Sequence, residues 1–399
     1  GSPTRVFDES AQSVRHHTII PLYPLAEWIV ENWWYIFNEK YAPKKSAEFA
    51  SRHSIKGIRD GFSFPDISFI PFDDHVSVAW QRYNPSFSSI QYLSSGSSYL
   101  SKENLRSELS EFVSAVTNRL EDLGLFGTFL QEEWAYIQSI SCDERKFCDF
   151  VSSFGADPLS LSDMDAAIAE KVYDDFVGPY AEVISGLELA EADEFRDYIE
   201  QFRSIIRRNS FDMSGVCEIR KMVSQNLLHR EQPWWEGYDL AHLCNISLNL
   251  DPLKLKDIET LGGAFSLPLH NADSLFASRN FGVFDGIFDE HDGRMGIGVR
   301  RAGPKNVKFH LARVLCDILW HNNKNSSIIS SVFTRNQQRN RAFAAELLAP
   351  ASWLRKNVGG DFVSYERIVD ISEDLHVSEK IVEHQIQNHN IAQIVRDDE

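Results

Sequence analysis

Several residue types and patterns that mark whole classes of protein are scarce in this sequence. The 399 residues include five cysteines, and none of them forms a Cys-x-x-Cys pair, which argues against a disulfide scaffold and a zinc ribbon. No run approaches the roughly 20 apolar residues that cross a bilayer. Basic residues number 40 against 58 acidic ones, so the charge of −18 argues against a generally basic surface for nucleic acid or anionic lipid.

The remaining composition is that of a core-forming protein, with 43% hydrophobic residues and a length that predicts two or three units. We expect a cytoplasmic location, because the thiols are unpaired and no apolar signal core follows the first residues. We expect four regions. They are a small α+β unit at 1–95, a helical region at 96–228, a third domain at 229–358 and a small helical tail at 359–399.

Local patterns place the main elements along the chain. Ser101 is suited to begin a helix that Gly124 ends, and the stretch from Leu187 to Arg208 carries one apolar stripe, which predicts a packed surface helix. The last third alternates helices with short strands. The expected elements there are strands at Phe281–Phe288 and Met295–Val299 around a turn, and helices at Val307–His321 and Asn336–Leu348. The sequence therefore predicts a predominantly helical α+β protein.

Three segments of this last third resemble a known family. Residues Phe343 to Pro350, Phe-Ala-Ala-Glu-Leu-Leu-Ala-Pro, closely resemble the Phe-Ala-x-x-Leu-Leu-Met-Pro signature of the ImmA/IrrE metallopeptidase family. Lys308–His321 is similar to the family helix that carries HExxH, and Ile368–Ile394 resembles the helical segment that commonly follows. The resemblance covers about residues 230–395. It implies a zincin-like fold and a role in controlling repressors, in stress responses, toxin–antitoxin systems or phage defence.

The residues that carry the family chemistry are replaced here. In HExxH, two histidines one helical turn apart bind Zn²⁺ and the glutamate activates the metal-bound water. Those positions fall on Arg313, Val314 and Asp317, and the family's further acidic position falls on Gln337. A guanidinium has no free lone pair for a metal, and valine accepts no proton. We therefore expect a catalytically inactive relative with no cofactor, in which Arg313 pairs with Asp317 where zinc would lie.

Two alternatives remain open at this point. A displaced metal site could use Asp317, His321 and His310, which would make the chain a zinc metallopeptidase that cleaves a repressor-type protein. A nucleic-acid-associated role could use a local basic patch, because residues 301–350 hold eight basic residues against two acidic ones. We expect this patch to bind a partner, most simply an acidic or phosphate-bearing protein. Its expected binding residues are Lys324, Arg335, Arg339 and Arg341.

Overall fold

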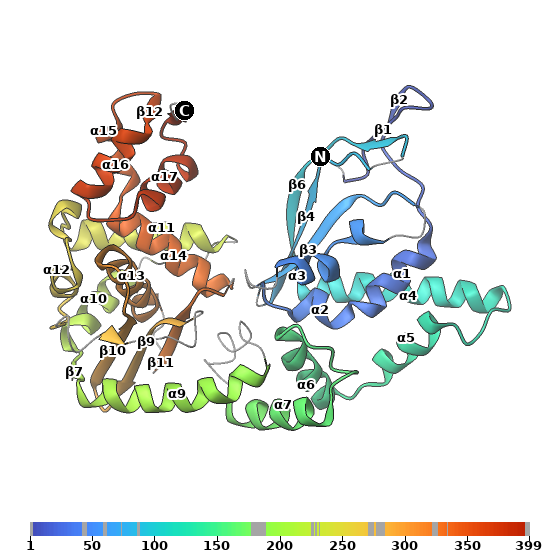
Figure 1. Ribbon diagram of the computed structural model, residues 1–399, viewed down its shortest axis with the longest axis horizontal. Helices are drawn as coiled ribbons and strands as arrows, with labels where there is room; N and C mark the ends of the chain where they lie inside the picture. Colours follow the sequence, from blue (N-terminus) through green and yellow to red (C-terminus); the bar gives the residue numbers. More distant parts are fainter. Residues whose placement is uncertain are drawn as a thin grey trace. The chain divides into compact units, whose positions relative to one another are not determined.

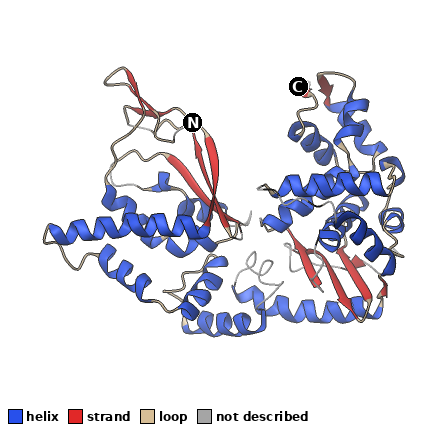
Figure 2. Cartoon of the chain, turned by 180° about the vertical axis from the view of Figure 1, so that it is seen from behind, coloured by secondary structure: helices blue, strands red, loops and turns tan. Residues whose placement is uncertain are grey.

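The computed structural model describes residues 3–41, 46–58, 62–72, 74–85, 88–176, 189–224, 227, 230, 232–269, 275–276, 284–320, 326–332 and 334–395. Its residues divide into two compact units, an N-terminal unit up to Asp175 and a C-terminal unit from Glu191 onward (Figure 1). Helices dominate and the sheets are small (Figure 2), which confirms the expected α+β class. No helix among the described residues is long and apolar enough to cross a membrane.

The N-terminal unit combines two small antiparallel sheets with a group of helices (Figure 1). One sheet has the strand order β2-β1-β5 and the other has the order β3-β4-β6. The strands are β1 (Val6–Asp8), β2 (Ser13–Arg15), β3 (Asp66–Phe72), β4 (His75–Gln81), β5 (Ile90–Tyr92) and β6 (Gly96–Ser101). The helices are α1 (Leu22–Glu31), α2 (Trp33–Asn38), α3 (Ser46–His53), η2 (Ile55–Gly57), α4 (Lys102–Asp122), α5 (Phe129–Ser139), α6 (Cys142–Ser153) and α7 (Asp163–Phe176).

Helix ends in this unit follow from local sequence. Ser101 caps α4 by accepting a hydrogen bond from the amide of Asn104 at 3.2 Å, and Gly124 lies just beyond the helix with a left-handed φ of 73°. Both confirm the predicted α4. The core of the unit is aromatic. Trp33 lies edge-on to Phe37 and to Trp134, with ring centroids 5.1 Å apart in each pair.

The C-terminal unit is built on a mixed sheet with the order β11-β9-β10-β7, in which β8 also pairs with β10. The strands of the whole C-terminal unit are β7 (Phe211–Asp212), β8 (Leu275–Phe276), β9 (Phe284–His291), β10 (Arg294–Arg300), β11 (Ser326–Ser330), β12 (Phe362–Ser364) and β13 (Gln393–Val395). Its helices are α9 (Leu189–Arg208), α10 (Ser214–Ser224), α11 (Pro233–Ser247), η3 (Pro252–Lys254), α12 (Ile258–Ala264), α13 (Pro304–Trp320), α14 (Arg335–Leu348), α15 (Ala351–Val358), α16 (Tyr365–Asp374) and α17 (Glu379–Asn388).

Glycines allow two helices to approach this sheet closely. A Cβ on Gly298 of β10 would lie 2.4 Å from the ring of Phe202 on α9, and a Cβ on Gly286 of β9 would lie 2.8 Å from Val314 on α13. The hairpin between β9 and β10 turns at Asp292 and Gly293, which both have positive φ, as tight two-residue hairpins require. The predicted pair of strands is therefore present, and α13 is fixed against it.

The expected regional boundaries differ from the division between the compact units. The stretch that contains α9 was assigned to a helical region ending at residue 228, whereas α9 packs on β10 within the C-terminal unit. Similarly, β6 begins just after the expected boundary at residue 95 but pairs with β4 of the N-terminal unit. In both cases the boundary expected from a change in local composition is wrong for the packing, because contacts between residues far apart in the sequence join the segments on its two sides.

A buried lysine joins the C-terminal helices to the rest of their unit. Lys308 of α13 is fully buried, and its Nζ donates hydrogen bonds to the carbonyl oxygens of Leu255 (2.6 Å) and Leu375 (2.8 Å). Leu375 is the C-terminal cap of α16, where carbonyl groups have no partner within the helix. Burial lowers the pKa of Lys308 to about 8.

The lowered pKa of Lys308 makes the stability of this unit depend on pH in a defined window. Between about pH 8 and 10.5 the unfolded chain holds the Lys308 proton and the folded chain releases it, so rising pH stabilises the folded state. Relative to a Lys308→Met variant, the wild type should gain up to about 3 kcal/mol of unfolding free energy across the window. Urea unfolding at pH 7.5 and 9.5 measures this. An equal difference at both pH values would contradict it, and the exposed Lys254→Met serves as the control.

Candidate functional site

Helix α13 carries the positions that correspond to HExxH, and it is buried almost all around. Val314 packs against Gly286 of β9, and Cys316 is fully buried, where desolvation raises the pKa of its thiol. A thiol in that environment stays protonated and unreactive. This agrees with the helix being a core element whose charged side chains must find partners in the interior.

Arg313 is held by three elements other than its own helix. Its Nη1 contacts Oδ2 of Asp285 on β9 at 2.7 Å. Its Nη2 donates to Oε1 of Gln337 on α14 at 2.8 Å and to the carbonyl oxygen of Ser330 on β11. Gln337 is itself fixed, because its Oε1 accepts from the Ser330 amide and its Nε2 donates to the carbonyl of Ile328, both at 3.0 Å. The guanidinium is therefore bonded in a definite orientation.

The expected ion pair between Arg313 and Asp317 is wrong. Although the two residues are one turn apart on α13, Arg313 extends toward β9 and β11, and Asp317 faces α14. There Oδ1 of Asp317 accepts a hydrogen bond from the side-chain Nδ2 of Asn340 at 3.4 Å and lies 3.6 Å from Nη2 of Arg339. Spacing along a helix puts two side chains within reach, but better partners in the tertiary structure decide which pairs form.

Asp285 gathers further groups around the Arg313 site. Its Oδ1 lies 2.7 Å from Nη2 of Arg300 on β10 and 3.8 Å from Nδ1 of His310 on α13. Burial lowers the pKa of His310 to about 4, so the imidazole is neutral at pH 7. One carboxylate thus faces two guanidinium groups and a neutral histidine, with a net positive charge at the place that the resemblance assigns to a dication.

A second buried network occupies the residues expected to form a basic binding patch. Arg335 of α14 lies 2.6 Å from Oε1 of Glu236 on α11, and Arg339 lies 3.6 Å from Oε2 of the same carboxylate. The Arg339 guanidinium also stacks 4.4 Å from the ring centre of Trp320, and its side chain is only 3% exposed. Arg341 donates to the carbonyl of Val332 at 3.0 Å.

The expected surface patch is therefore wrong for Arg339, which faces the interior because it meets two buried carboxylates there. Arg335 keeps 25% of its side chain exposed but is engaged by Glu236. Lys324, the fourth expected binding residue, lies outside the described residues.

The donor set around Arg313 does not suit zinc. Catalytic zinc needs three protein ligands, and of the corresponding positions only Asp317 could supply one. That carboxylate already interacts with Arg339 and Asn340, while His310 lies by Asp285. His321, the remaining member of the displaced set, lies outside the described residues. Across the described ranges, no group of three or more His, Cys, Asp or Glu side chains could hold a metal.

The family-like segment on α14 contributes a structural carboxylate. Glu346 accepts hydrogen bonds from the amide of Ala351, the first residue of α15, and from Nε2 of Gln385 on α17 at 2.7 Å. A carboxylate at a helix N-terminus satisfies amides that lack partners and complements the helix dipole. Glu346 therefore joins α14, α15 and α17. Sequence reasoning used this segment as a helix and as the family-like signature, and it assigned no role to Glu346.

An aromatic groove is lined by residues of α11, α13, α14 and α17. It has a volume of about 540 Å³, and Trp235, which is 47% exposed, and Tyr238 stand edge-on to each other along it. Arg341 and the exposed His384 add polar edges. The lining residues among the described part of the chain include no carboxylate. They are Trp234, Trp235, Tyr238, Phe309, Gln338, Arg341, Ala342, Ala345, Ile381, His384, Gln385 and Asn388.

Comparison of the chain with protein-family models and with curated proteins finds no match. The resemblance to the ImmA/IrrE family thus rests on the three motifs. Sequence reasoning also missed Asp285 and Glu236, the carboxylates on which both networks depend. Each is an acid within an apolar or aromatic run, Val-Phe-Asp-Gly and Trp-Trp-Glu-Gly, and that context is the feature that could have indicated burial.

A double-mutant cycle distinguishes the observed partner of Arg313 from the expected one. Combining Arg313→Met with Asp285→Leu should show a coupling of about 1–3 kcal/mol in the free energy of urea unfolding. Asp285→Leu leaves the buried Arg313 without a carboxylate, and Arg313→Met removes one of the two guanidinium partners of Asp285. Combining Arg313→Met with Asp317→Leu should show a coupling below about 0.5 kcal/mol. A larger coupling to Asp317 than to Asp285 would contradict the network.

Proposed function

We propose that this chain is a catalytically inactive relative of the ImmA/IrrE metallopeptidases and that it acts as a regulatory protein by binding another protein. The observation that carries the proposal is the fixed guanidinium of Arg313, bonded to Asp285, Gln337 and the Ser330 carbonyl. In the zincin-like arrangement that the motifs imply, this cation takes the place of a metal ligand. The small mixed sheet with α13 packed on it, and α14 packed on α13, is compatible with that arrangement.

Peptide hydrolysis by the family mechanism has no support from the residues at these positions. The reaction needs a metal-bound water and a base to take its proton. Arg313 repels a cation, Val314 has no group to accept a proton, and the amide of Gln337 replaces an acid. The buried networks would also have to be dismantled to expose Asp317, which leaves charges unpaired at a cost of several kcal/mol.

The aromatic groove is the surface that best suits a protein partner. The exposed Trp235 and the half-buried Tyr238 supply aromatic contact area, and such side chains are typical anchors of protein interfaces. Because Arg341 and His384 line the groove and its described lining contains no carboxylate, it favours a peptide segment with apolar side chains and nearby acidic residues. By resemblance, the partner would belong to a bacterial stress-response, toxin–antitoxin or phage-defence system in the cytoplasm.

The other two candidate functions have weaker support. A displaced metal site would need Asp317 released from Arg339 and Asn340. A nucleic-acid contact through the expected patch would need arginines that are engaged elsewhere, with Arg335 bound by Glu236 and Arg339 buried. Partner binding requires no such rearrangement, since the groove is already formed.

Zinc binding tests the inactive assignment. Purified full-length protein titrated with Zn²⁺ should show no stoichiometric high-affinity site, and metal analysis after dialysis should find no zinc that depends on Asp317. An Asp317→Ala variant serves as the comparison, because adventitious sites on surface histidines persist in it. One zinc per chain that disappears in Asp317→Ala would contradict the proposal, and zinc-dependent peptidase activity lost in the same variant would do so more strongly.

Peptide binding tests the groove. A fluorescent peptide of alternating Leu, Phe and Glu residues should bind at least about tenfold more tightly than the same peptide with Lys in place of Glu. Replacing Trp235 with alanine should weaken binding by about tenfold, the loss typical of an aromatic anchor. The matched control is Phe362→Ala, which removes an aromatic side chain that is 65% exposed and lies outside the groove. Equal binding of both peptides, or equal loss in both variants, would contradict the assignment.

A further inference from the structure

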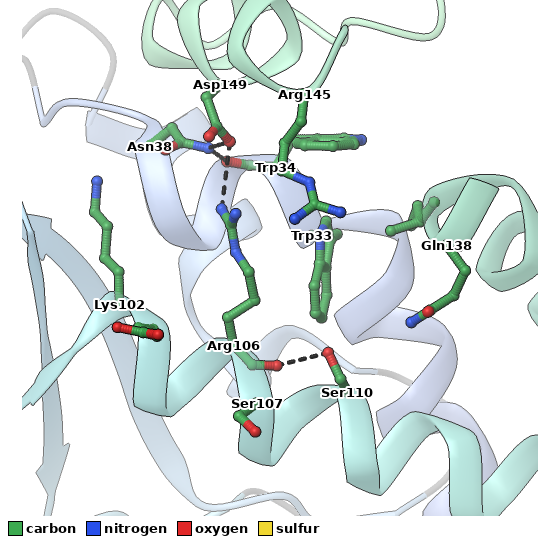
Figure 3. Close-up of a pocket in the computed structure, with 12 residues that line it drawn as sticks. Trp33, Trp34, Asn38, Lys102, Arg106, Ser107, Ser110, Gln138, Arg145 and Asp149 are labelled. Atoms are coloured by element: carbon green, nitrogen blue, oxygen red, sulfur yellow. Dashed lines mark hydrogen bonds and ion pairs between the residues drawn. The ribbon is translucent and has the colours of Figure 1, made fainter. Parts of the chain in front are cut away.

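The N-terminal unit contains a pocket of about 580 Å³ that is separate from every residue of the site above. Helices α2, α4, α5 and α6 converge on it, and basic, aromatic and amide side chains line it (Figure 3). Its volume lies within the range typical of small-molecule sites. The lining residues are Trp33, Trp34, Asn38, Lys102, Glu103, Arg106, Ser107, Ser110, Ile137, Gln138, Arg145 and Asp149.

One wall of the pocket carries the Arg106 guanidinium, which neighbouring side chains hold in place. Arg106 of α4 lies over the ring of Phe37, 4.7 Å from its centre, and its Nη2 donates to Oδ1 of Asp149 at 3.3 Å. The same carboxylate oxygen accepts from Nδ2 of Asn38 at 2.7 Å (Figure 3). Asp149 is therefore engaged in holding Arg106, and the guanidinium is oriented before any ligand arrives. Such preorganisation reduces the entropic cost of binding.

The second guanidinium of the pocket differs from the first in its contacts. Arg145 of α6 is exposed, and its guanidinium forms no hydrogen bond or ion pair with the described part of the chain. In Figure 3 the side chains of Arg106 and Arg145 reach into the space from opposite walls.

The charge of the lining favours an anion. Lys102, Arg106 and Arg145 face two carboxylates, and one of these, Asp149, already pairs with Arg106. A net positive pocket in a chain with a charge of −18 concentrates anions locally. Guanidinium groups bind phosphate oxygens through two parallel hydrogen bonds, which suits a pair of arginines on opposite walls.

We propose that this pocket binds a small phosphate ester that carries a flat ring, the chemistry of a nucleoside monophosphate. The guanidinium groups of Arg106 and Arg145 take the phosphate. The ring contacts the apolar edges that the largely buried Trp33, Trp34 and Ile137 present to the pocket, and the Gln138 amide is available to its polar edge. The pocket volume exceeds what a bare phosphate needs. This proposal stands independently of the function proposed for the C-terminal unit.

Calorimetric titration of the full-length protein with the four common nucleoside monophosphates tests the proposal. At least one should bind with a micromolar dissociation constant, and its affinity should fall as NaCl is raised, since charge pairing contributes. Arg145→Gln should weaken binding at least tenfold. Arg145 is exposed and its guanidinium forms no hydrogen bond or ion pair with the described residues, so this variant should keep the wild-type melting temperature. The matched control is Arg119→Gln, an exposed arginine on α4 outside the pocket, which should bind as the wild type does.

Two further titrations separate the parts of the ligand. Inorganic phosphate and the free nucleoside should each bind at least tenfold more weakly than the monophosphate. If inorganic phosphate binds as tightly as the monophosphate, the proposed role of the tryptophan edges is overturned. If the free nucleoside binds as tightly as the monophosphate, the proposed role of the arginines is overturned. No binding of any monophosphate at millimolar concentration, or unchanged binding by Arg145→Gln, would overturn the proposal as a whole.

Discussion

A guanidinium removed from water needs acceptors for its N–H groups, and the C-terminal unit depends on the acceptors that the two terminal nitrogens of Arg313 find. Its partners come from β9, β11 and α14, so one side chain of α13 ties together the sheet and the helix that covers its edge. Breaking such an arrangement leaves buried charge unpaired at a cost of several kcal/mol. The same bonds that stabilise the unit thus keep a fixed positive charge at the position where the resemblance implies zinc.

The remaining buried charges follow the same principle. Glu236 of α11 meets two arginines of α14, and Gly237, the next residue, lets the two helices approach so closely that a Cβ there would lie 2.4 Å from the Arg339 carbonyl. Arginines that composition alone places in a basic patch are therefore used to join helices. Because these arginines are engaged between helices, the aromatic groove is the surface feature that can contact a partner. For this reason we favour partner binding over catalysis as the function.

Features set by neighbouring residues could be predicted from the sequence, and features set by distant ones could not. The Ser101 cap, the stop at Gly124 and the presence of a turn between β9 and β10 depend on a few adjacent residues. Asp285 precedes Arg313 by 28 positions, and Glu236 precedes Arg335 by 99, so only the fold brings them together. The pocket between α2, α4, α5 and α6 likewise has no pattern in one segment. Helical spacing suggested Asp317 as the partner of Arg313 because it was the nearest acid along the chain.

The central claim is that Arg313, held by Asp285 and Gln337, occupies the place of a metal ligand. Anomalous scattering at the zinc absorption edge, measured on crystals of the full-length protein soaked with Zn²⁺, tests this most directly. The account predicts no anomalous peak at the carboxylates of Asp285 or Asp317 and an Arg313 guanidinium still bonded to Asp285. A zinc peak coordinated by Asp317, with the Arg313 side chain displaced from Asp285, would contradict it.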